Sequence, residues 1–177
     1  MNSFISEAEP DFNLSIQMGT ESDRQSLLDL KSDSSLGDGI DLVYIYSLID
    51  DFINYPNKPG NVIYIGEAGR NKKTGTRFSQ HISTKEHTGA DTGTNYTLSR
   101  YYWMGKKLNL KIYILGSKND KKYRKDVESQ LFKQHIKVFG ALPIGQGASG
   151  ESYRVSDIHK IKICDVLNHI IPVILSQ

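Results

Sequence analysis

The segment from Asp41 to Leu48, D-L-V-Y-I-Y-S-L, limits the fold more than any other part of this sequence. It is rich in β-branched and aromatic residues, which favour the extended backbone of a β-strand. Because neighbouring side chains of a strand point to opposite faces, Val43 and Ile45 are expected on one face. Tyr44 and Tyr46 then occupy the other. We therefore predict a strand with two differently composed faces.

The rest of the chain adds two strand patterns and three helix patterns. After a loop rich in Pro, Asn and Gly, the sequence N-V-I-Y-I-G predicts a strand at 61–66 that can pair with the first as a long-looped hairpin. A third strand is predicted at Leu110–Gly116. Helices are predicted from Thr76 to about Ser83, from Asn95 to Leu108 and from Lys121 to Val138. The expected fold class is α/β, with a small central three-stranded, mainly antiparallel sheet flanked by helices.

The formal charge is unevenly distributed along the chain. Residues 1–51 carry 11 Asp and Glu against Arg24 and Lys31, whereas residues 52–177 carry 20 Lys and Arg against 9 Asp and Glu. A Lys-rich body of this kind suits a polyanion, because neutralising phosphates releases condensed counterions. We predict an acidic N-terminal arm over 1–40, a core over 41–147, and a C-terminal extension over 148–177 that packs on the core.

Composition narrows the classes of function. A single cysteine leaves no partner for an internal disulfide and no set of ligands for a multi-cysteine zinc site. The longest apolar runs, such as 170–175, fall far short of the roughly 20 residues needed to cross a bilayer. The first residues have neither the basic start nor the apolar stretch of a secretory signal. We therefore expect a cytoplasmic protein with no membrane partner.

Four short motifs follow one another in order, each on a matching predicted element. They are L-V-Y at 42–44, Y-I-G at 64–66, R-F-S-Q-H at 77–81 and E-S-Q-L-F at 128–132. In this combination, over about 105 residues from Leu42 to Gln146, the chain resembles the GIY-YIG nuclease superfamily. The resemblance implies a metal-dependent endonuclease that hydrolyses DNA phosphodiester bonds, with residues 41–147 as its nuclease core.

The resemblance also implies roles for five residues. Glu128 would hold one Mg²⁺ or Mn²⁺, and Arg77 would clamp the scissile phosphate. Tyr44 would activate water directly or by relay, while Tyr64 and His81 would orient the reacting groups. These residue types suit the reaction, because it needs an oxygen ligand for a hard divalent cation, a guanidinium that forks onto phosphate oxygens, and a positioned base. His81 follows Arg77 by four residues, so on one helix the two would share a face.

The chain departs from the family pattern at several positions. Leu42 replaces the glycine that opens the first motif, and the connection from Tyr44 to Tyr64 is longer than in compact members. The asparagine that many members carry after the glutamate helix is missing, and Gln146 is the nearest amide. Tyr46 lies two residues after Tyr44 on the same strand face, so it is an alternative for the role of Tyr44.

Basic residues outside the motifs are candidates for contact with the DNA backbone. Those expected to bind substrate are Lys72, Lys73, Arg100 and Lys106. The chain is expected to act as a stand-alone restriction-type, phage or mobile-element nuclease. Two alternatives stay open: a non-catalytic nucleic-acid-binding module on the same scaffold, and a nuclease toxin held by a partner. The sequence is compatible with a monomer and with a homodimer.

Overall fold

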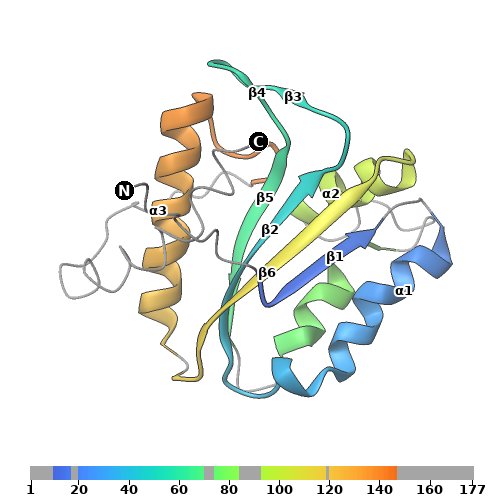
Figure 1. Cartoon of the computed structure of the whole chain (residues 1–177), viewed down its shortest axis with the longest axis vertical. Coiled ribbons are helices and arrows are strands. Elements are labelled where there is room, and N and C mark those ends of the chain that lie inside the picture. Colours follow the sequence, from blue (N-terminus) through green and yellow to red (C-terminus); the bar gives the residue numbers. More distant parts are fainter. Residues whose placement is uncertain (1–9, 17–19, 70–73, 84–92, 119, 147–177) are drawn as a thin grey trace, which may run out of the picture.

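The computed structural model describes residues 10–16, 20–69, 74–83, 93–118 and 120–146, and its centre is an antiparallel sheet (Figure 1). The strands of this sheet are β1 (Phe12–Ile16), β2 (Asp41–Leu48), β5 (Val62–Ala68) and β6 (Leu108–Gly116). Their spatial order is β1-β6-β2-β5, and each neighbouring pair is antiparallel. A small ribbon of β3 (Ile53–Asn54) and β4 (Pro59–Gly60) interrupts the connection from β2 to β5.

β2 is the central element, and all eight of its residues are buried. It lies between β6 and β5 and has a packed apolar layer on each face. Tyr44 and Tyr46 belong to one layer, whereas Val43 and Ile45 belong to the other. The predicted division of the strand into two faces is therefore confirmed.

Short helices cover the face of the sheet that carries Tyr44 and Tyr46 (Figure 1). They are α1 (Glu21–Asp29), η1 (Leu30–Ser32), η2 (Ser34–Leu36), η3 (Thr74–Gln80) and α2 (Gly93–Trp103), of which the three labelled η are 3₁₀ helices. Their buried side chains include Leu27, Leu30, Leu36, Phe78, Leu98 and Tyr102. This layer places η3 directly over the two tyrosines.

α3 (Lys121–Phe139) covers the opposite face and matches its predicted bounds to within one residue (Figure 1). Asp120 caps its N-terminus by accepting a hydrogen bond from the backbone N–H of Tyr123. Gly140 ends the helix at φ 82°, a left-handed conformation that glycine adopts without steric cost.

α3 runs antiparallel to β5. Its first turns lie beside the end of β5, where Arg124 contacts Glu67. Its last residue, Phe139, lies against Gly60, just before β5 begins. Because β5 is an edge strand of the described sheet, one long side of α3 borders the open edge.

The sheet has four strands, so the prediction of three is wrong. The additional strand, β1, pairs with β6 from Phe12 opposite Ile112 to Ile16 opposite Leu108. It comes from the segment that was expected to form an acidic arm, and this segment also buries Leu27 in the core. Only five residues long, with alternate residues exposed, β1 gives a weak periodic signal in an acidic, Ser-rich context.

Three other elements, η3, α2 and β6, differ from their predicted bounds. The segment after β5 forms the 3₁₀ helix η3, and His81 follows this helix instead of lying within it. α2 ends at Trp103, and β6 starts at Leu108, two residues earlier than predicted. The predicted extension over 148–177 lies outside the described residues. Within the described ranges, no helix is long and apolar enough to cross a membrane.

Candidate active site

Three tyrosines of β2 and β5 form the centre of the candidate site. Tyr46 pairs with Tyr64 across the two strands, and Tyr44 pairs with Gly66. The ring centroids of Tyr44 and Tyr46 are 6.1 Å apart, and those of Tyr44 and Tyr64 are 5.9 Å apart. Strand pairing thus brings together the tyrosines of the first two motifs, which a long loop separates in the sequence.

Gly66 makes room for this cluster. A β-carbon at this position would lie 2.5 Å from both Cζ and Oη of Tyr44, and 2.8 Å from Cε1 of Tyr64. These distances are too short for a close-packed interior, so a larger residue would displace both rings. The glycine of Y-I-G therefore serves the packing of the two tyrosines.

Arg77 brings a positive charge to the tyrosines from η3. Its half-buried guanidinium is hydrogen-bonded to the hydroxyls of Tyr44 and Tyr64. Because arginine carries only donors, both phenol oxygens accept from it. A guanidinium has five N–H donors, so Arg77 can hold both tyrosines and still donate to an oxyanion.

His81 lies between two tyrosine hydroxyls and is 1% exposed. Its Nε2 is 3.3 Å from Oη of Tyr44, and its Nδ1 is 2.9 Å from Oη of Tyr46. Burial, assisted by the charge of Arg77, lowers the pKa of His81 to about 3. The imidazole is therefore neutral near pH 7, where it can orient a hydroxyl but cannot serve as a cationic phosphate ligand.

Tyr44 is a neutral phenol at the same pH. Burial, and to a smaller extent the neighbouring Tyr64, raise the pKa of Tyr44 well above 10. The charge and hydrogen bond of Arg77 act in the other direction and offset this only in part. A reaction that uses Tyr44 as a base therefore needs further stabilisation of its phenolate.

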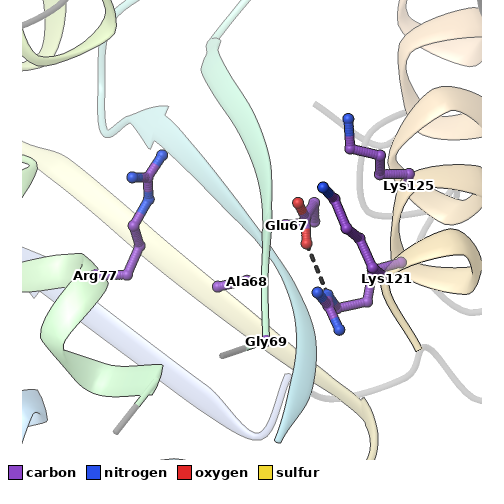
Figure 2. Close-up of a pocket in the computed structure, with 7 residues that line it drawn as sticks. Glu67, Ala68, Gly69, Arg77, Lys121 and Lys125 are labelled. Atoms are coloured by element: carbon purple, nitrogen blue, oxygen red, sulfur yellow. Dashed lines mark hydrogen bonds and ion pairs between the residues drawn. The ribbon is translucent and has the colours of Figure 1, made fainter. Parts of the chain in front are cut away.

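A hollow of about 400 Å³ opens at the end of β5, and Figure 2 shows the side chains that line it. Arg77 lines it from η3, and Lys121 and Lys125 line it from α3. Figure 2 shows Arg77 on one side of β5 and the two lysines on the other. Both helix layers therefore contribute cations to one hollow at the edge of the sheet.

Arg124 also lines the hollow, and two carboxylates hold it in place. Its Nε donates to Glu67 over 2.7 Å, the contact dashed in Figure 2, and its Nη1 donates to Asp41. Arg124 and Asp41 are buried, and the Glu67 side chain is 19% exposed. Four basic residues thus face Glu67 and the adjacent Asp41, which leaves the hollow with a net positive charge.

Glu128 lies on the stripe of α3 that borders the hollow, although it does not line the hollow itself. It follows Arg124 by four residues and Lys125 by three, spacings that share one helix face. Four residues of a helix rise about 6 Å, which is about the length that two residues of a strand span. With Arg124 beside Glu67, the half-buried Glu128 therefore lies level with Ile65. Arg77 belongs to the helix layer on the face of Tyr44, and Glu128 belongs to α3, which covers the opposite face.

The oxygen donors at this edge suit a divalent cation held mainly by water and substrate. The part of the chain that the structure describes has no group of three or more His, Cys, Asp or Glu that could hold a metal ion. Mg²⁺, however, is commonly bound through one or two carboxylates together with water and phosphate oxygens. Glu128 offers such a carboxylate. The residues therefore fit a sparsely liganded Mg²⁺ or Mn²⁺, not a metal enclosed by protein.

Gln146 offers a second oxygen along β5. It follows Gly145, whose N–H donates to the carbonyl of Ile63 over 2.8 Å. Its Oε1 is buried and has no hydrogen-bond partner among the described residues. Buried polar atoms are normally paired, so this amide oxygen has capacity for a ligand.

Of the four residues predicted to bind substrate, the structure describes Arg100 and Lys106, and neither lines the hollow. Lys72 and Lys73 lie outside the described residues. Arg100 is exposed on α2, where it lines a separate surface depression with Thr97, Tyr101 and Met104. Lys106 forms an ion pair with Asp51, beyond the far end of β2. The lysines that do line the hollow, Lys121 and Lys125, come from α3.

Sequence reasoning missed the ion pairs of Arg124 and the double contact of His81. Asp41 and Glu67 lie 83 and 57 residues from Arg124, so no local pattern reveals them. Tyr46 could be found, because strand alternation puts it on the face of Tyr44. Comparison of the chain with protein-family models, curated proteins and solved structures found no match. Function is therefore inferred from the geometry and chemistry of these residues.

Proposed function

We propose that this chain is a metal-dependent endonuclease of the GIY-YIG type that hydrolyses DNA phosphodiester bonds. The observation that carries the proposal is the edge of β5. There, Arg77 and the tyrosine cluster lie on one face of the sheet, and the helix spacing from Arg124, which contacts Glu67, is expected to bring Glu128 to this edge from the other face. A phosphate at this edge would meet a guanidinium, a buried phenol and a carboxylate together.

Each group has a role that its surroundings support. Arg77 binds the scissile phosphate and stabilises the charge that develops on its oxygens. The phenolate of Tyr44 takes the proton of the attacking water as that water adds to phosphorus. The bond from phosphorus to the leaving oxygen then breaks, and this oxygen takes a proton from solvent. Tyr64 keeps Arg77 in place, since it accepts a hydrogen bond from the guanidinium.

Glu128 would hold the divalent cation, with the oxygen of Gln146 available nearby along β5. When bound, Mg²⁺ or Mn²⁺ supplies charge neutralisation at the phosphate. Arg124, one turn earlier, anchors α3 and would thereby keep the carboxylate of Glu128 at the strand edge. The protein thus provides the position, and water and substrate provide most of the ligands.

The DNA backbone is expected to pass over the start of α3. Lys121 and Lys122 lie in the first turn, where the positive end of the helix dipole makes cations unfavourable by about 0.3–1 kcal/mol each. Such a cost is offset when an anion binds there, and the adjacent hollow is already net positive. A phosphate next to the scissile one therefore fits between Lys121, Lys125 and Arg77.

Removing these lysines should reduce the salt dependence of DNA binding. We expect Lys121→Gln and Lys125→Gln each to lower the slope of log K against log salt concentration by about 0.9, since each neutralises one phosphate. Fluorescence anisotropy with a labelled duplex between low and moderate salt measures this slope. Lys137→Gln makes the same charge change 16 residues further along α3, about 24 Å away, and should leave the slope unchanged. Equal slopes for all three variants would contradict this DNA path.

The activity itself is tested by cleavage of plasmid, linear and branched DNA. Purified protein should nick or cut at least one of these substrates with Mg²⁺ or Mn²⁺. It should be inactive with EDTA, because no divalent cation is then present to neutralise the charge of the phosphate. Gel electrophoresis of timed samples gives the rate. Absence of cleavage of all three DNA substrates with either metal would refute the proposal.

A non-catalytic nucleic-acid-binding module is the second candidate, and the burial of Tyr44 and His81 favours it. Both side chains are at most 1% exposed, so water must enter before Tyr44 can act as a base. A module of this type would bind DNA through Arg77 and the lysines of α3 without cutting it. Binding at low salt combined with no cleavage in either metal would select this reading.

A further inference from the structure

The hydroxyl of Tyr46 is buried and has one hydrogen-bond partner in the described part of the chain. Its side chain is 0% exposed, and its Oη lies 2.9 Å from Nδ1 of His81. A buried O–H that donates to nothing costs about 1–3 kcal/mol. A neutral imidazole can accept from only one of the two buried phenols, and Oη of Tyr46 makes the shorter contact, 2.9 Å against 3.3 Å for Tyr44, which also has Arg77 as a partner. The proton of Tyr46 is therefore directed at Nδ1.

This fixes the position of the imidazole proton. A neutral histidine carries a proton on one ring nitrogen and a lone pair on the other. With Nδ1 as the acceptor, the proton of His81 is on Nε2, which faces Oη of Tyr44 at 3.3 Å. We infer that Tyr46 is a positioning residue that holds His81 in the Nε2–H tautomer, so that His81 and Arg77 both donate to the phenol oxygen of Tyr44.

The catalytic meaning of this inference rests on the proposed function. The phenol oxygen of Tyr44 has two lone pairs, and in this arrangement one accepts from His81 and the other from Arg77. When Tyr44 becomes a phenolate, the proton that it loses is its own hydroxyl proton. Two donors stabilise the phenolate more than the phenol. Because Nε2 already carries a proton, it cannot accept one from Tyr44. The route by relay into His81 is therefore closed, and Tyr44 acts as a direct base.

The groups around His81 agree with this assignment. Tyr44 and Tyr46 face it from β2, Tyr64 lies 6.4 Å away from β5 between ring centroids, and Arg77 acts on it from η3. On the side of α1, Arg24 donates to the carbonyl of Ile82, the next residue. The charged groups nearby are thus cations, which keep His81 neutral.

Nitrogen-15 NMR of the full chain with labelled histidine tests the tautomer without any need for nuclease activity. A protonated and a bare ring nitrogen have well-separated chemical shifts. We expect His81 to show a proton on Nε2 and a bare Nδ1, unchanged from pH 8 down to pH 5, because its pKa is about 3. A proton on Nδ1 at pH 7, or a cationic ring at pH 6, would overturn the inference.

Tyr46→Phe tests the role of Tyr46 directly. The variant leaves Nδ1 without its donor, so the Nδ1–H tautomer should become populated in the same spectra. The cleavage rate at pH 7.5 should fall about 10- to 100-fold, the value of a hydrogen bond to a charged group. For the wild type the rate should rise about tenfold per pH unit between pH 6 and 8, as the phenolate fraction increases.

Tyr102→Phe is the matched control. It also removes a buried hydroxyl on this face of the sheet, one that donates to the carbonyl of Thr20, but does not contact His81. Its His81 tautomer and cleavage rate should equal those of the wild type. An unchanged tautomer in Tyr46→Phe would overturn the inference. If the wild type cuts no DNA, the proposed function fails, whereas the tautomer measurement still decides the role of Tyr46.

Discussion

Glu128→Gln should abolish DNA cleavage while the protein stays folded. The substitution keeps the size of the side chain and removes the negative charge that would hold the divalent cation. A bound metal supplies several kcal/mol of transition-state stabilisation, so we expect a loss of at least about 1,000-fold in the cleavage rate. The rate is measured under single-turnover conditions in Mg²⁺ and again in Mn²⁺.

The same variant should bind DNA as well as the wild type or better, since one negative charge beside the phosphate path is gone. Glu21→Gln, an equal change at the exposed start of α1, serves as the control and should cut normally. Circular dichroism and urea unfolding establish that both variants are folded. Cleavage by Glu128→Gln within tenfold of the wild-type rate would remove the carboxylate from the proposed mechanism.

The helix that carries Glu128 also illustrates which structural features could be predicted from the sequence. The apolar spacing of Val127, Leu131 and Phe132 predicts the helix, and the spacing of four residues puts Glu128 on the same helix face as Arg124. Strand alternation in the segment around Tyr44 was equally informative, because both faces of β2 are buried and a shift of one residue would exchange them. Local patterns of this kind are reliable where burial enforces them.

What the sequence could not provide is the meeting of distant segments. Arg77 reaches the hydroxyl of Tyr44 because η3 lies over β2, and the direction of a short 3₁₀ helix has no signature in seven residues. The fourth strand was missed for a related reason, since β1 is stabilised by its pairing with β6 and not by a strong pattern of its own. Contacts between distant segments, not local propensity, determine both the position of Arg77 and the formation of β1.

Arg124 shows the same dependence on distant partners, and its loss should cause the largest change in stability. Arg124→Met leaves Asp41 as a carboxylate that is 2% exposed, with its charge uncompensated. Breaking one side of a buried ion pair typically costs about 3–5 kcal/mol, which we expect in the free energy of unfolding measured with urea at pH 7. Lys122→Met, an exposed position on the same helix, should change it by less than about 0.5 kcal/mol.

Replacing the unpaired Asp41 carboxylate with a neutral amide should recover part of the lost free energy of unfolding. Arg124→Met combined with Asp41→Asn is expected to regain at least about 1 kcal/mol over Arg124→Met alone, because the asparagine carries no charge into the interior. A cost below about 1 kcal/mol for the single variant, or no recovery in the double variant, would show that the pair does not anchor α3. Since Arg124 ties the start of α3 to β2 and β5, the anchored helix sets Lys121 and Lys125 opposite Arg77 across the hollow, and it would also position Glu128. The double variant should therefore recover stability without recovering full cleavage.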